Sequence, residues 1–358
     1  MKTSSKHILI ISYYSKPFNS VGVKRTDYWF EHLPEYGFST TKITAIPQTS
    51  NQPNILFVSP DSSKPILSYF IKDQGIKWIK PLKTKLKEFS RNAFSHILIT
   101  GGPFMQMLIS KWIKSHFNAT LILDFRDPFF ANPRFQTSLI KDGIKKYFQN
   151  RFLKNADLVI TVNNECAKNI HFNNIKIIDN GYDDMIFHKI KLNHQEKNQL
   201  LNPILIGRVD SDFDIQPLIH VLSAQNLKLH YAGNYQLNEL SNHIFHLGNL
   251  SYEELLVELY KHKVCILPTT GYPFESTTKI FDFLALNKII FIITHGDIQS
   301  GSLHEITKDY PNVFWAKNNP DSLLETFQEL NRHIVKPFHT EVFSRKEGLK
   351  KLVKLIDK

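Results

Sequence analysis

The sequence predicts an α/β fold built from two Rossmann-like domains with parallel sheets. The chain has 358 residues, more than one hydrophobic core usually serves, so two domains are expected. Short apolar runs alternate with longer segments of helical periodicity almost throughout, and the runs are apolar on both faces. Strands of this kind are typical of a parallel sheet that is covered by helices on both sides.

The N-terminal half contains the first series of expected elements. We expect strands at 7–14, 41–46, 54–59, 96–100, 120–125, 157–162 and 175–179. Helical patterns lie between them at 21–36, 103–116 and 136–155. The polar stretch 189–202 has few hydrophobic residues and is therefore interpreted as a linker.

A second series of elements follows this stretch. We expect its strands at 203–208, 227–233, 243–248, 263–269, 288–294 and 312–317. Helical patterns lie at 251–261, 276–286 and 320–333. The last stretch of the chain has apolar residues at roughly helical spacing with lysines elsewhere, which predicts a terminal amphipathic helix.

These series divide the chain into parts. We expect an N-terminal Rossmann-like domain at 1–190, a C-terminal one at 191–338, and the terminal helix within 339–358. Whether this helix packs back on the N-terminal domain is open at this point. The two sheets are expected to face a central cleft, which is the natural ligand site of such a pair.

Composition narrows the class of protein. Two cysteines, Cys166 and Cys265, are too few for a disulfide framework or a cysteine-based zinc site. The first apolar run suits a buried strand better than a signal peptide, so we expect a cytoplasmic protein. The net charge of +11 favours an anionic partner, whether nucleotide, nucleic acid or acidic lipid surface. Charge alone does not choose among them.

The first strand-to-helix turn contains candidate binding residues in "YYSKPFNSVGVKRTDYWF" (13–30). Gly22 lets the backbone approach a ligand closely. Lys24 and Arg25 fall in the first helical turn, where their charges would complement an anion. One glycine is not a dinucleotide motif, and an ordinary strand-to-helix turn is the alternative.

A second group of candidates lies in "LILDFRDPFFANP" (121–133), where an apolar strand ends. Asp124, Arg126 and Asp127 stand at that end, and Pro128 prevents a regular ladder from continuing. In an open α/β sheet, this carboxyl end of the strand faces the ligand. An Arg–Asp pair that only fixes a loop is the alternative.

Two glycines follow later strands. In "IIDNGYDDMIF" (177–187), Asn180 and Gly181 suit a tight turn with positive φ. In "LIGRVDSDFD" (205–214), Gly207 and Arg208 end the first strand of the second series, where a guanidinium is able to clamp a diphosphate. The aspartates at 210, 212 and 214 leave a metal site open, although loop and N-cap roles fit them better.

The stretch "ESTTKIFDFLAL" (275–286) separates two apolar strands. Ser276, Thr277 and Thr278 are candidate N-cap residues, so free N–H groups around Lys279 are expected to point at a ligand together with the charge of Lys279. Asp282, one turn later, is suited to accept hydrogen bonds from ribose hydroxyls. The alternative is a solvated capping turn with an i,i+3 ion pair.

Together these segments resemble the GT-B nucleotide-sugar glycosyltransferases, in particular bacterial members similar to glycosyltransferase family 4. The resemblance rests on the order and spacing of several motifs. These are "SYYSKPFNSVGVKRTDYW", "TGGPF", "LDFRDPF", "ADLVITV", "IIDNGYD", "LIGRV" and "TTKIFDFLALNKIIF". It implies a donor held by the C-terminal domain, an acceptor held by the N-terminal domain, and neither cofactor nor catalytic metal.

The resemblance also implies roles for single residues. Asp282 matches the family's ribose-binding acid, with Asp in place of Glu, and Glu275 stands one residue from the position of the acid near the donor sugar. Lys279 supplies the cation that family members tend to have several residues after the arginine matched here by Arg208. Asp127 occupies the neighbourhood of a family histidine. The predicted catalytic set is therefore Arg208, Lys279, Asp127 and Glu275.

The same family resemblance predicts the chemistry. A nucleoside diphosphate leaves while the sugar passes through an oxocarbenium-like transition state, so cations at the β-phosphate matter more than a strong base. The donor set is predicted to be Gly22, Gly207, Arg208, Thr277, Thr278, Lys279 and Asp282. The acceptor or cleft set is predicted to be Lys24, Arg25, Asp124, Arg126, Asn180 and Gly181. The family further suggests retention at the anomeric carbon.

A basic segment, residues 71–91, carries seven cations interleaved with apolar residues that include Trp78. It is suited to lie on anionic lipid headgroups, which favours a lipid-linked acceptor. A solvated helix with an apolar inner face is the alternative, because Pro81 interrupts a long helix. No nucleic-acid module accompanies the segment, so no nucleic-acid partner is expected.

Three functions remain open from the sequence. The first is a cytoplasmic, peripherally membrane-associated glycosyltransferase that acts at the inner face of the plasma membrane in cell-surface glycan synthesis, such as that of lipopolysaccharide or capsule. The second is a nucleotide-sugar epimerase or hydrolase on the same fold. The third is a non-catalytic protein that binds polyanions or membranes through its basic surface.

Overall fold

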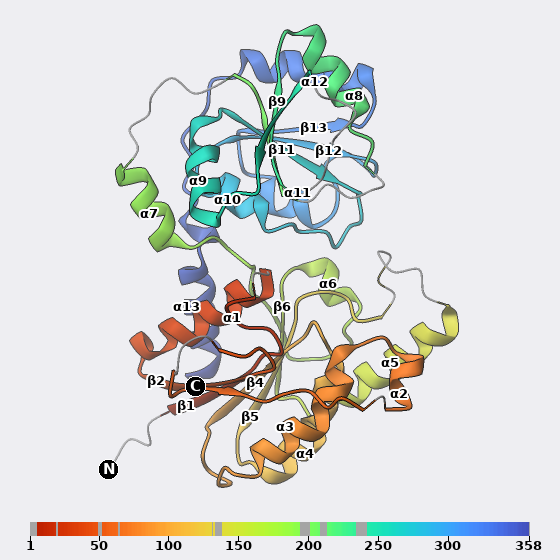
Figure 1. The fold of residues 1–358 in the computed structure, drawn as a ribbon, viewed down its shortest axis with the longest axis vertical. Helices are drawn as coiled ribbons and strands as arrows, with labels where there is room; N and C mark the ends of the chain where they lie inside the picture. The colour runs from red at the N-terminus through yellow and green to blue at the C-terminus, as the bar shows by residue number, and fades with distance from the viewer. Residues whose placement is uncertain are drawn as a thin grey trace. The chain divides into compact units, whose positions relative to one another are not determined.

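The computed structural model describes residues 6–18, 21–48, 52–63, 65–130, 132, 138–193, 201–207, 213–233 and 242–357. The chain forms two compact units. The N-terminal unit comprises Met1–Asn180 and Gly348–Lys358, and the C-terminal unit comprises Gly181–Glu347. Each unit has its own parallel sheet and its own helices, and each is described by itself (Figure 1).

The N-terminal unit contains a seven-stranded sheet in the order β3-β2-β1-β4-β5-β6-β7, in which every pair is parallel. Its strands are β1 (Lys6–Ile11), β2 (Phe38–Thr44), β3 (Ile55–Phe57), β4 (His96–Thr100), β5 (Thr120–Phe125), β6 (Leu158–Thr161) and β7 (Ile175–Ile177). All seven strands expected from the sequence are therefore present. The reversal of chain order between β1 and β4 is the switch point of a doubly wound sheet.

Helices cover both faces of this sheet. They are α1 (Val21–His32), α2 (Leu67–Phe70), α3 (Ile79–Leu86), α4 (Ser110–His116), α5 (Leu139–Leu153), α6 (Asn164–Lys168) and α13 (Arg345–Ile356), with 3-10 turns at Leu33–Tyr36, Gln74–Trp78 and Met105–Ile109. Only the part of α13 from Gly348 onward belongs to this unit. In Figure 1, α1 and α13 lie on one side of the sheet, and α3 and α4 lie on the other.

Strand β1 shows how both faces of the N-terminal sheet are buried. Its alternate residues Ile8 and Ile10 pack in one core cluster, which also contains Trp29 of α1 and Leu352 of α13. The intervening residue Leu9 packs in the other cluster, together with side chains of α3 and α4. Successive side chains of a strand point to opposite faces, so one apolar strand supplies two cores.

The C-terminal unit contains a six-stranded parallel sheet in the order β10-β9-β8-β11-β12-β13. Its strands are β8 (Ile204–Ile206), β9 (Leu229–Ala232), β10 (Ile244–Gly248), β11 (Val264–Thr269), β12 (Ile289–Thr294) and β13 (Val313–Lys317). All six expected strands are present. The order repeats that of the first six strands of the N-terminal unit, and the switch point lies between β8 and β11.

The helices of this unit also form two layers. They are α7 (Asp184–Asn193), α8 (Gln216–Ala224), α9 (Tyr252–Lys261), α10 (Lys279–Ala285), α11 (Gly301–Thr307) and α12 (Pro320–Arg332), with a 3-10 turn at Glu341–Phe343. Residues of α8 and α12 share one core cluster, and residues of α9, α10 and α11 share another. Figure 1 shows α8 and α12 together on one side of the sheet.

The predicted linker at 189–202 is wrong in its first part. Helix α7 continues to Asn193, and its side chains Phe187 and Ile190 are buried in the core of the C-terminal unit. Their spacing of three residues places them on one helix face. One apolar residue just before the polar stretch and one at its start therefore anchor a helix that the polarity of the stretch concealed.

Among the described residues, no helix has both the length and the apolar character needed to cross a bilayer.

Candidate functional site

The switch point of the C-terminal unit gives the candidate site its position. Strands β8 and β11 are neighbours, and chain order reverses between them. In open α/β sheets, ligands bind outside the carboxyl ends of the strands at this point. Gly207 directly follows β8, and Thr269 ends β11. The side chains near these two residues form the candidate site.

Gly207 and Lys279 are brought together at this edge. Gly207 has a φ of +72°, a value that side chains with a Cβ rarely adopt. A Cβ built on Gly207 would lie 2.9 Å from Cε and 3.1 Å from Nζ of Lys279. The Gly207 backbone is fixed, because its N–H donates to the Ala232 carbonyl at 2.7 Å and its carbonyl accepts from the Tyr231 hydroxyl at 3.0 Å. The side chain of Lys279 therefore lies against a rigid glycine.

Several predicted site residues lie outside the described residues. These are Arg208 and the aspartates at 210 and 212. The third aspartate, Asp214, lies just before Ile215, the N-cap of α8, and its Oδ1 accepts a hydrogen bond from the backbone N–H of Gln216 at 2.9 Å.

The start of α10 differs from the expected arrangement. The N-cap is Thr278, but its side chain makes no capping hydrogen bond. The N–H of Ile280 donates to the Thr277 carbonyl at 3.2 Å, and that of Phe281 donates to the Thr278 carbonyl at 3.1 Å. The expectation of free N–H groups after Lys279 is thus wrong for these two residues. Positive charge at this point comes from the side chain of Lys279 itself.

Glu275 is anchored beside the end of β11. Its side chain is buried, and its Oε2 accepts hydrogen bonds from Thr269 Oγ1 at 2.6 Å, Thr270 Oγ1 at 2.8 Å and Thr270 N at 3.2 Å. Three donors to one oxygen fix the orientation of the Glu275 carboxylate. Thr269 and Thr270 were not among the residues predicted for the site, although two hydroxyl residues at the end of an apolar strand are a recognisable signal.

Asp282 is held by a tyrosine that the sequence analysis also missed. Its Oδ1 accepts a hydrogen bond from the Tyr252 hydroxyl at 2.7 Å, and the carboxylate is largely buried. Burial, followed by the negative charge of Asp282, raises the pKa of Tyr252, so the phenol stays protonated and donates. Tyr252 is the first residue of α9 and thereby positions a carboxylate in the first turn of α10.

In the N-terminal unit, Arg126 occupies a cradle of three glycines at the carboxyl edge of the sheet. Its guanidinium fills the space that a Cβ on Gly22 would need, and a Cβ on Gly102 would lie 3.2 Å from its NH2 nitrogen. Its Nε donates to the Gly101 carbonyl at 3.1 Å. The close approach expected at Gly22 is therefore made by a side chain of the same unit.

Arg25 and Asp124 form a buried network behind this cradle. Arg25 is 2% exposed and donates to the carbonyls of Ile178 and Asp179 at 2.7 and 2.8 Å. Its NH2 also contacts Asp124 Oδ1 at 3.4 Å, and the other carboxylate oxygen accepts from the Thr100 hydroxyl at 2.9 Å. This network connects α1, β4, β5 and the segment after β7.

The remaining predicted residues are less closely grouped. Asp127 is exposed just after β5, and Lys24 is partly buried in α1. Asn180 is buried, and its Oδ1 has no hydrogen-bond partner among the described residues. Gly181 has the expected positive φ, +68°, and its backbone passes close to those of Phe343 and Arg345. Asn180 belongs to the N-terminal unit and Gly181 to the C-terminal unit.

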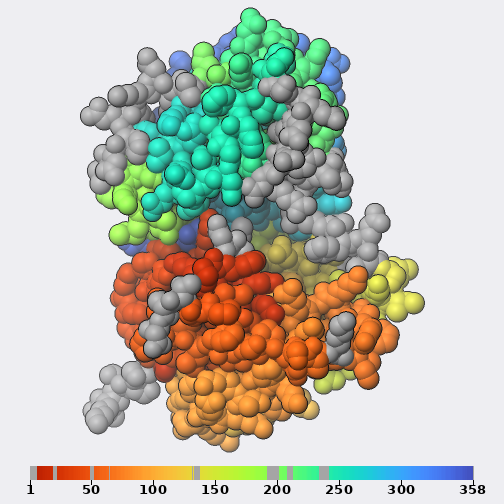
Figure 2. Space-filling view, in the orientation of Figure 1, coloured from red at the N-terminus to blue at the C-terminus, as the bar shows by residue number. Residues whose placement is uncertain are grey.

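The basic segment 71–91 turns its apolar side chains inward. Ile76, Trp78, Leu82 and Leu86 are buried in the core of the N-terminal unit. The ring of Trp78 is covered by protein, and its indole N–H donates to the Val58 carbonyl at 2.7 Å, which fits the alternative of a helix with an apolar inner face. Figure 2 shows the orange part of the chain, which contains α2 and α3, on the surface of this unit.

Comparisons with known proteins relate this geometry to a fold. No protein-family model matches the chain, and no curated protein matches its sequence. The structure is similar to the catalytic domain of starch synthase IV from Arabidopsis thaliana, bound to ADP and acarbose, with a TM-score of 0.63, 10% identity, and coverage of 99% of both chains.

Two further solved structures are similar. One is a putative UDP-N-acetylglucosamine 2-epimerase from Listeria monocytogenes, with a TM-score of 0.61, 9% identity, and coverage of 99% of this chain and 96% of that one. The other is WaaG, a glycosyltransferase involved in lipopolysaccharide biosynthesis, with a TM-score of 0.58, 10% identity, and coverage of 98% and 95%. At these identities the likeness shows the fold, which is the GT-B class with two Rossmann-like domains.

Proposed function

We propose that the protein is a glycosyltransferase that moves a sugar from a nucleoside-diphosphate sugar to a glycan or lipid-linked acceptor. The observation that carries the proposal is the contact of Lys279 with Gly207 at the switch point of the C-terminal unit. A cation beside a fixed glycine backbone, at the edge where such sheets bind ligands, suits a diphosphate. The similar starch synthase structure contains ADP.

The donor chemistry assigns a role to each residue of the candidate site. Lys279, together with Arg208, would neutralise the charge that grows on the leaving diphosphate, which is the main electrostatic demand of this reaction. Asp282, oriented by Tyr252, would accept from a ribose hydroxyl. Glu275, held by Thr269 and Thr270, would contact the donor sugar. Thr277 and Thr278 would border the phosphates. The proposal requires no cofactor and no catalytic metal, and the family resemblance favours retention.

The acceptor is proposed to bind the N-terminal unit. The carboxyl edge of its sheet presents the partly buried guanidinium of Arg126 next to the exposed Asp127. A cation and a carboxylate side by side suit the hydroxyls of a glycan. We place the reaction at the cytoplasmic face of the membrane in cell-surface glycan synthesis, such as that of lipopolysaccharide or capsule, where a lipid-linked acceptor is available.

Membrane contact would come from α2 and its flanks rather than from the buried face of 71–91. Ile66, Tyr69 and Phe70 are 79, 72 and 54% exposed, and Lys72 next to them is also exposed. An apolar group with an adjacent cation is the arrangement that binds anionic lipid surfaces peripherally.

The test is release of nucleoside diphosphate from a panel of nucleotide-sugars, with and without lipid-linked acceptors. We expect one donor to be consumed, and Lys279→Ala to lower turnover or donor affinity by about tenfold or more, equivalent to about 1.4 kcal/mol. The matched control is Lys308→Ala at the C-cap of α11, which removes an exposed lysine paired with Glu305 in the same unit. If Lys279→Ala had wild-type kinetics, the proposed role of Lys279 in binding the donor phosphates would be overturned.

A nucleotide-sugar epimerase is the second candidate, favoured by the similarity to the Listeria protein. An epimerase would convert one nucleotide-sugar to another in the absence of any acceptor. A transferase would instead transfer the sugar to its acceptor and release a nucleoside diphosphate. Chromatography of the nucleotide products distinguishes the two. Accumulation of an epimeric nucleotide-sugar without acceptor would replace the transferase proposal.

A further inference from the structure

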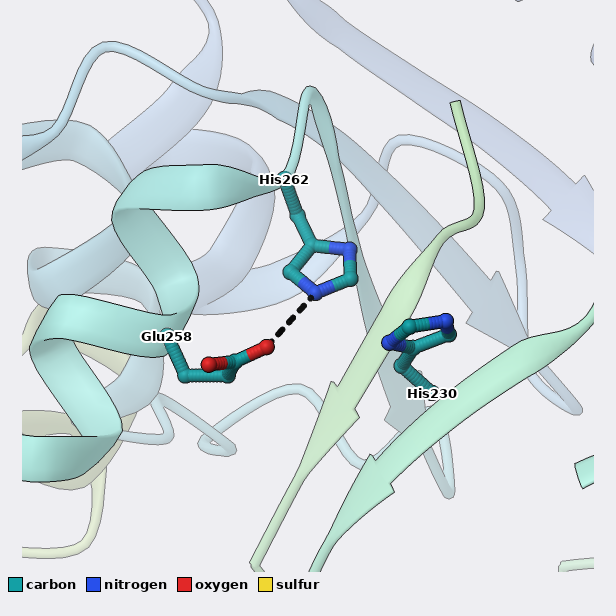
Figure 3. Close-up of side chains that lie close together, drawn as sticks. All are labelled: His230, Glu258 and His262. Carbon is teal, nitrogen blue, oxygen red and sulfur yellow. Dashed lines mark hydrogen bonds and ion pairs between the residues drawn. The ribbon is translucent and has the colours of Figure 1, made fainter. Parts of the chain in front are cut away.

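A cluster of three side chains in the C-terminal unit lies away from the candidate donor site. His230 of β9, Glu258 of α9 and His262, which directly follows α9, each offer a nitrogen or oxygen atom within 4.8 Å of the other two. Figure 3 shows the two imidazoles and the carboxylate close together, with His230 on a strand and Glu258 and His262 on a helix and its end. His230 pairs in register with Ile204, three residues before Gly207, so the cluster lies toward the amino ends of the strands. The candidate donor site lies at their carboxyl ends.

The tautomer of His262 is fixed by the backbone. Its Nδ1 lies 2.7 Å from the Asn202 carbonyl oxygen, which only accepts, so Nδ1 must carry the proton and donate. In the neutral ring, Nε2 then carries a lone pair and no proton. This Nε2 lies 3.4 Å from Glu258 Oε1. Two acceptors facing each other repel unless a cation lies between them or the ring is protonated. Metal-binding histidines typically donate their second nitrogen to a carbonyl in this manner.

His230 supplies a third candidate ligand atom, and no hydrogen bond competes for it among the described residues. Its Nδ1 is buried and has no hydrogen-bond partner among the described residues. Its ring packs edge-on against that of His262, with centroids 4.7 Å apart. Burial lowers the pKa of both histidines, which favours neutral rings with available lone pairs.

An ordinary ion-pair cluster is the competing interpretation. Glu258 Oε2 accepts from Lys261 Nζ at 2.5 Å, which neutralises part of its charge. That bond leaves Oε1, the oxygen that faces His262, for another partner. The ion pair between Glu258 and Lys261 does not involve His230. The buried Nδ1 of His230 therefore still has no hydrogen-bond partner among the described residues.

We propose that His230, Glu258 and His262 bind a divalent transition-metal ion, with Zn²⁺ the first candidate. Two histidines and one carboxylate are a ligand set that zinc uses, and the fourth position would hold water. Bond lengths of about 2.0–2.1 Å to tetrahedral zinc place ligand atoms about 3.3 Å apart, close to the separation between His262 and Glu258. The ion would connect β9 to the end of α9 and thereby stabilise the C-terminal unit.

The test uses the full-length protein, stripped of metal and free of nucleotide, titrated with Zn²⁺ or Co²⁺ alone. We expect one equivalent to bind, Co²⁺ to give the visible absorption of a four-coordinate site, and Zn²⁺ to raise the melting temperature by mass action. His230→Ala and Glu258→Gln should each weaken Zn²⁺ binding about tenfold or more and remove the Co²⁺ absorption. His262→Ala is less informative because the side chain is fully buried.

Two variants of the same unit are matched controls. His220→Ala removes an exposed histidine of α8, and Glu253→Gln changes an exposed carboxylate of α9. Both should bind Zn²⁺ as the wild type does. The proposal is overturned if the wild-type protein shows no four-coordinate Co²⁺ spectrum, or if folded His230→Ala and Glu258→Gln retain wild-type affinity. Circular dichroism of each metal-free variant establishes that it is folded.

Discussion

Lys279 lies against the backbone of Gly207, with its Cε only 2.9 Å from the position of a Cβ at that glycine. Gly207→Ala should therefore do two things. It should strain a backbone with φ of +72°, at a cost of about 1–3 kcal/mol, and it should push the ammonium of Lys279 away from its place. We expect a lower urea midpoint together with about tenfold weaker nucleoside-diphosphate binding, measured by calorimetry.

Gly143→Ala is the matched control for this prediction. Gly143 lies within α5, and a Cβ there would meet no atom within 4 Å. Alanine in a helix is favoured over glycine by about 1 kcal/mol, so this variant should be as stable as the wild type or more so. If Gly207→Ala had the same urea midpoint and the same nucleoside-diphosphate affinity as Gly143→Ala, the contact between Gly207 and Lys279 would not contribute to donor binding.

Gly22 and Arg126 allow a double-mutant cycle. Gly22→Ala places a methyl group where the guanidinium of Arg126 lies, so the arginine must leave its bonds to Gly101. We expect Gly22→Ala to destabilise the protein by about 1–3 kcal/mol, as overpacking does. In an Arg126→Ala background the same substitution should cost less, because the colliding group is gone. If urea unfolding gave the same loss of stability for Gly22→Ala in both backgrounds, the contact between Gly22 and the guanidinium of Arg126 would be contradicted.

The strands and the parallel class of both sheets were predictable from the sequence because the central strands are apolar on both faces. Ile8 to Ile11 and Ile289 to Ile293 form uninterrupted runs that only a sheet covered on both sides buries fully. Positive φ at Gly181 was likewise predictable, since the pair Asn180–Gly181 signals a turn locally. These features depend on neighbouring residues in the chain.

The features that sequence reasoning missed depend on contacts between distant residues. Nothing near Asp282 indicates that Tyr252, thirty positions earlier, holds its carboxylate. Arg126 reaches Gly22 across more than a hundred positions. The free N–H groups expected after Lys279 are used by the local carbonyls of Thr277 and Thr278, a choice between turn geometries that residue types alone do not determine. The proposed metal-binding set joins His230 of β9 to two residues at the end of α9, and no known metal motif links them in sequence.

Stability should fall on mild acidification. Burial lowers the pKa of His7 and His96 below the ordinary value, so both stay neutral in the folded N-terminal unit. The unfolded chain takes up these protons at a pKa of about 6.5, and the folded state therefore loses stability as the pH falls below that value. Urea midpoints at a series of pH values should decrease below about pH 6.5. His96→Gln should reduce this slope, and an unchanged slope would contradict the assignment.

Membrane binding provides the last prediction. Tyr69 and Phe70 are exposed beside Lys72, so the double variant Tyr69→Ser, Phe70→Ser should lose most of its cosedimentation with vesicles of anionic phospholipid. The matched control is Ile334→Ser, which removes an exposed apolar side chain, 82% accessible, from the C-terminal unit. Zwitterionic vesicles should bind the wild type weakly, because the attraction of Lys72 and its basic neighbours is then absent. Equal sedimentation of the double variant and the wild type with anionic vesicles would exclude α2 as the membrane contact while leaving the donor site untouched.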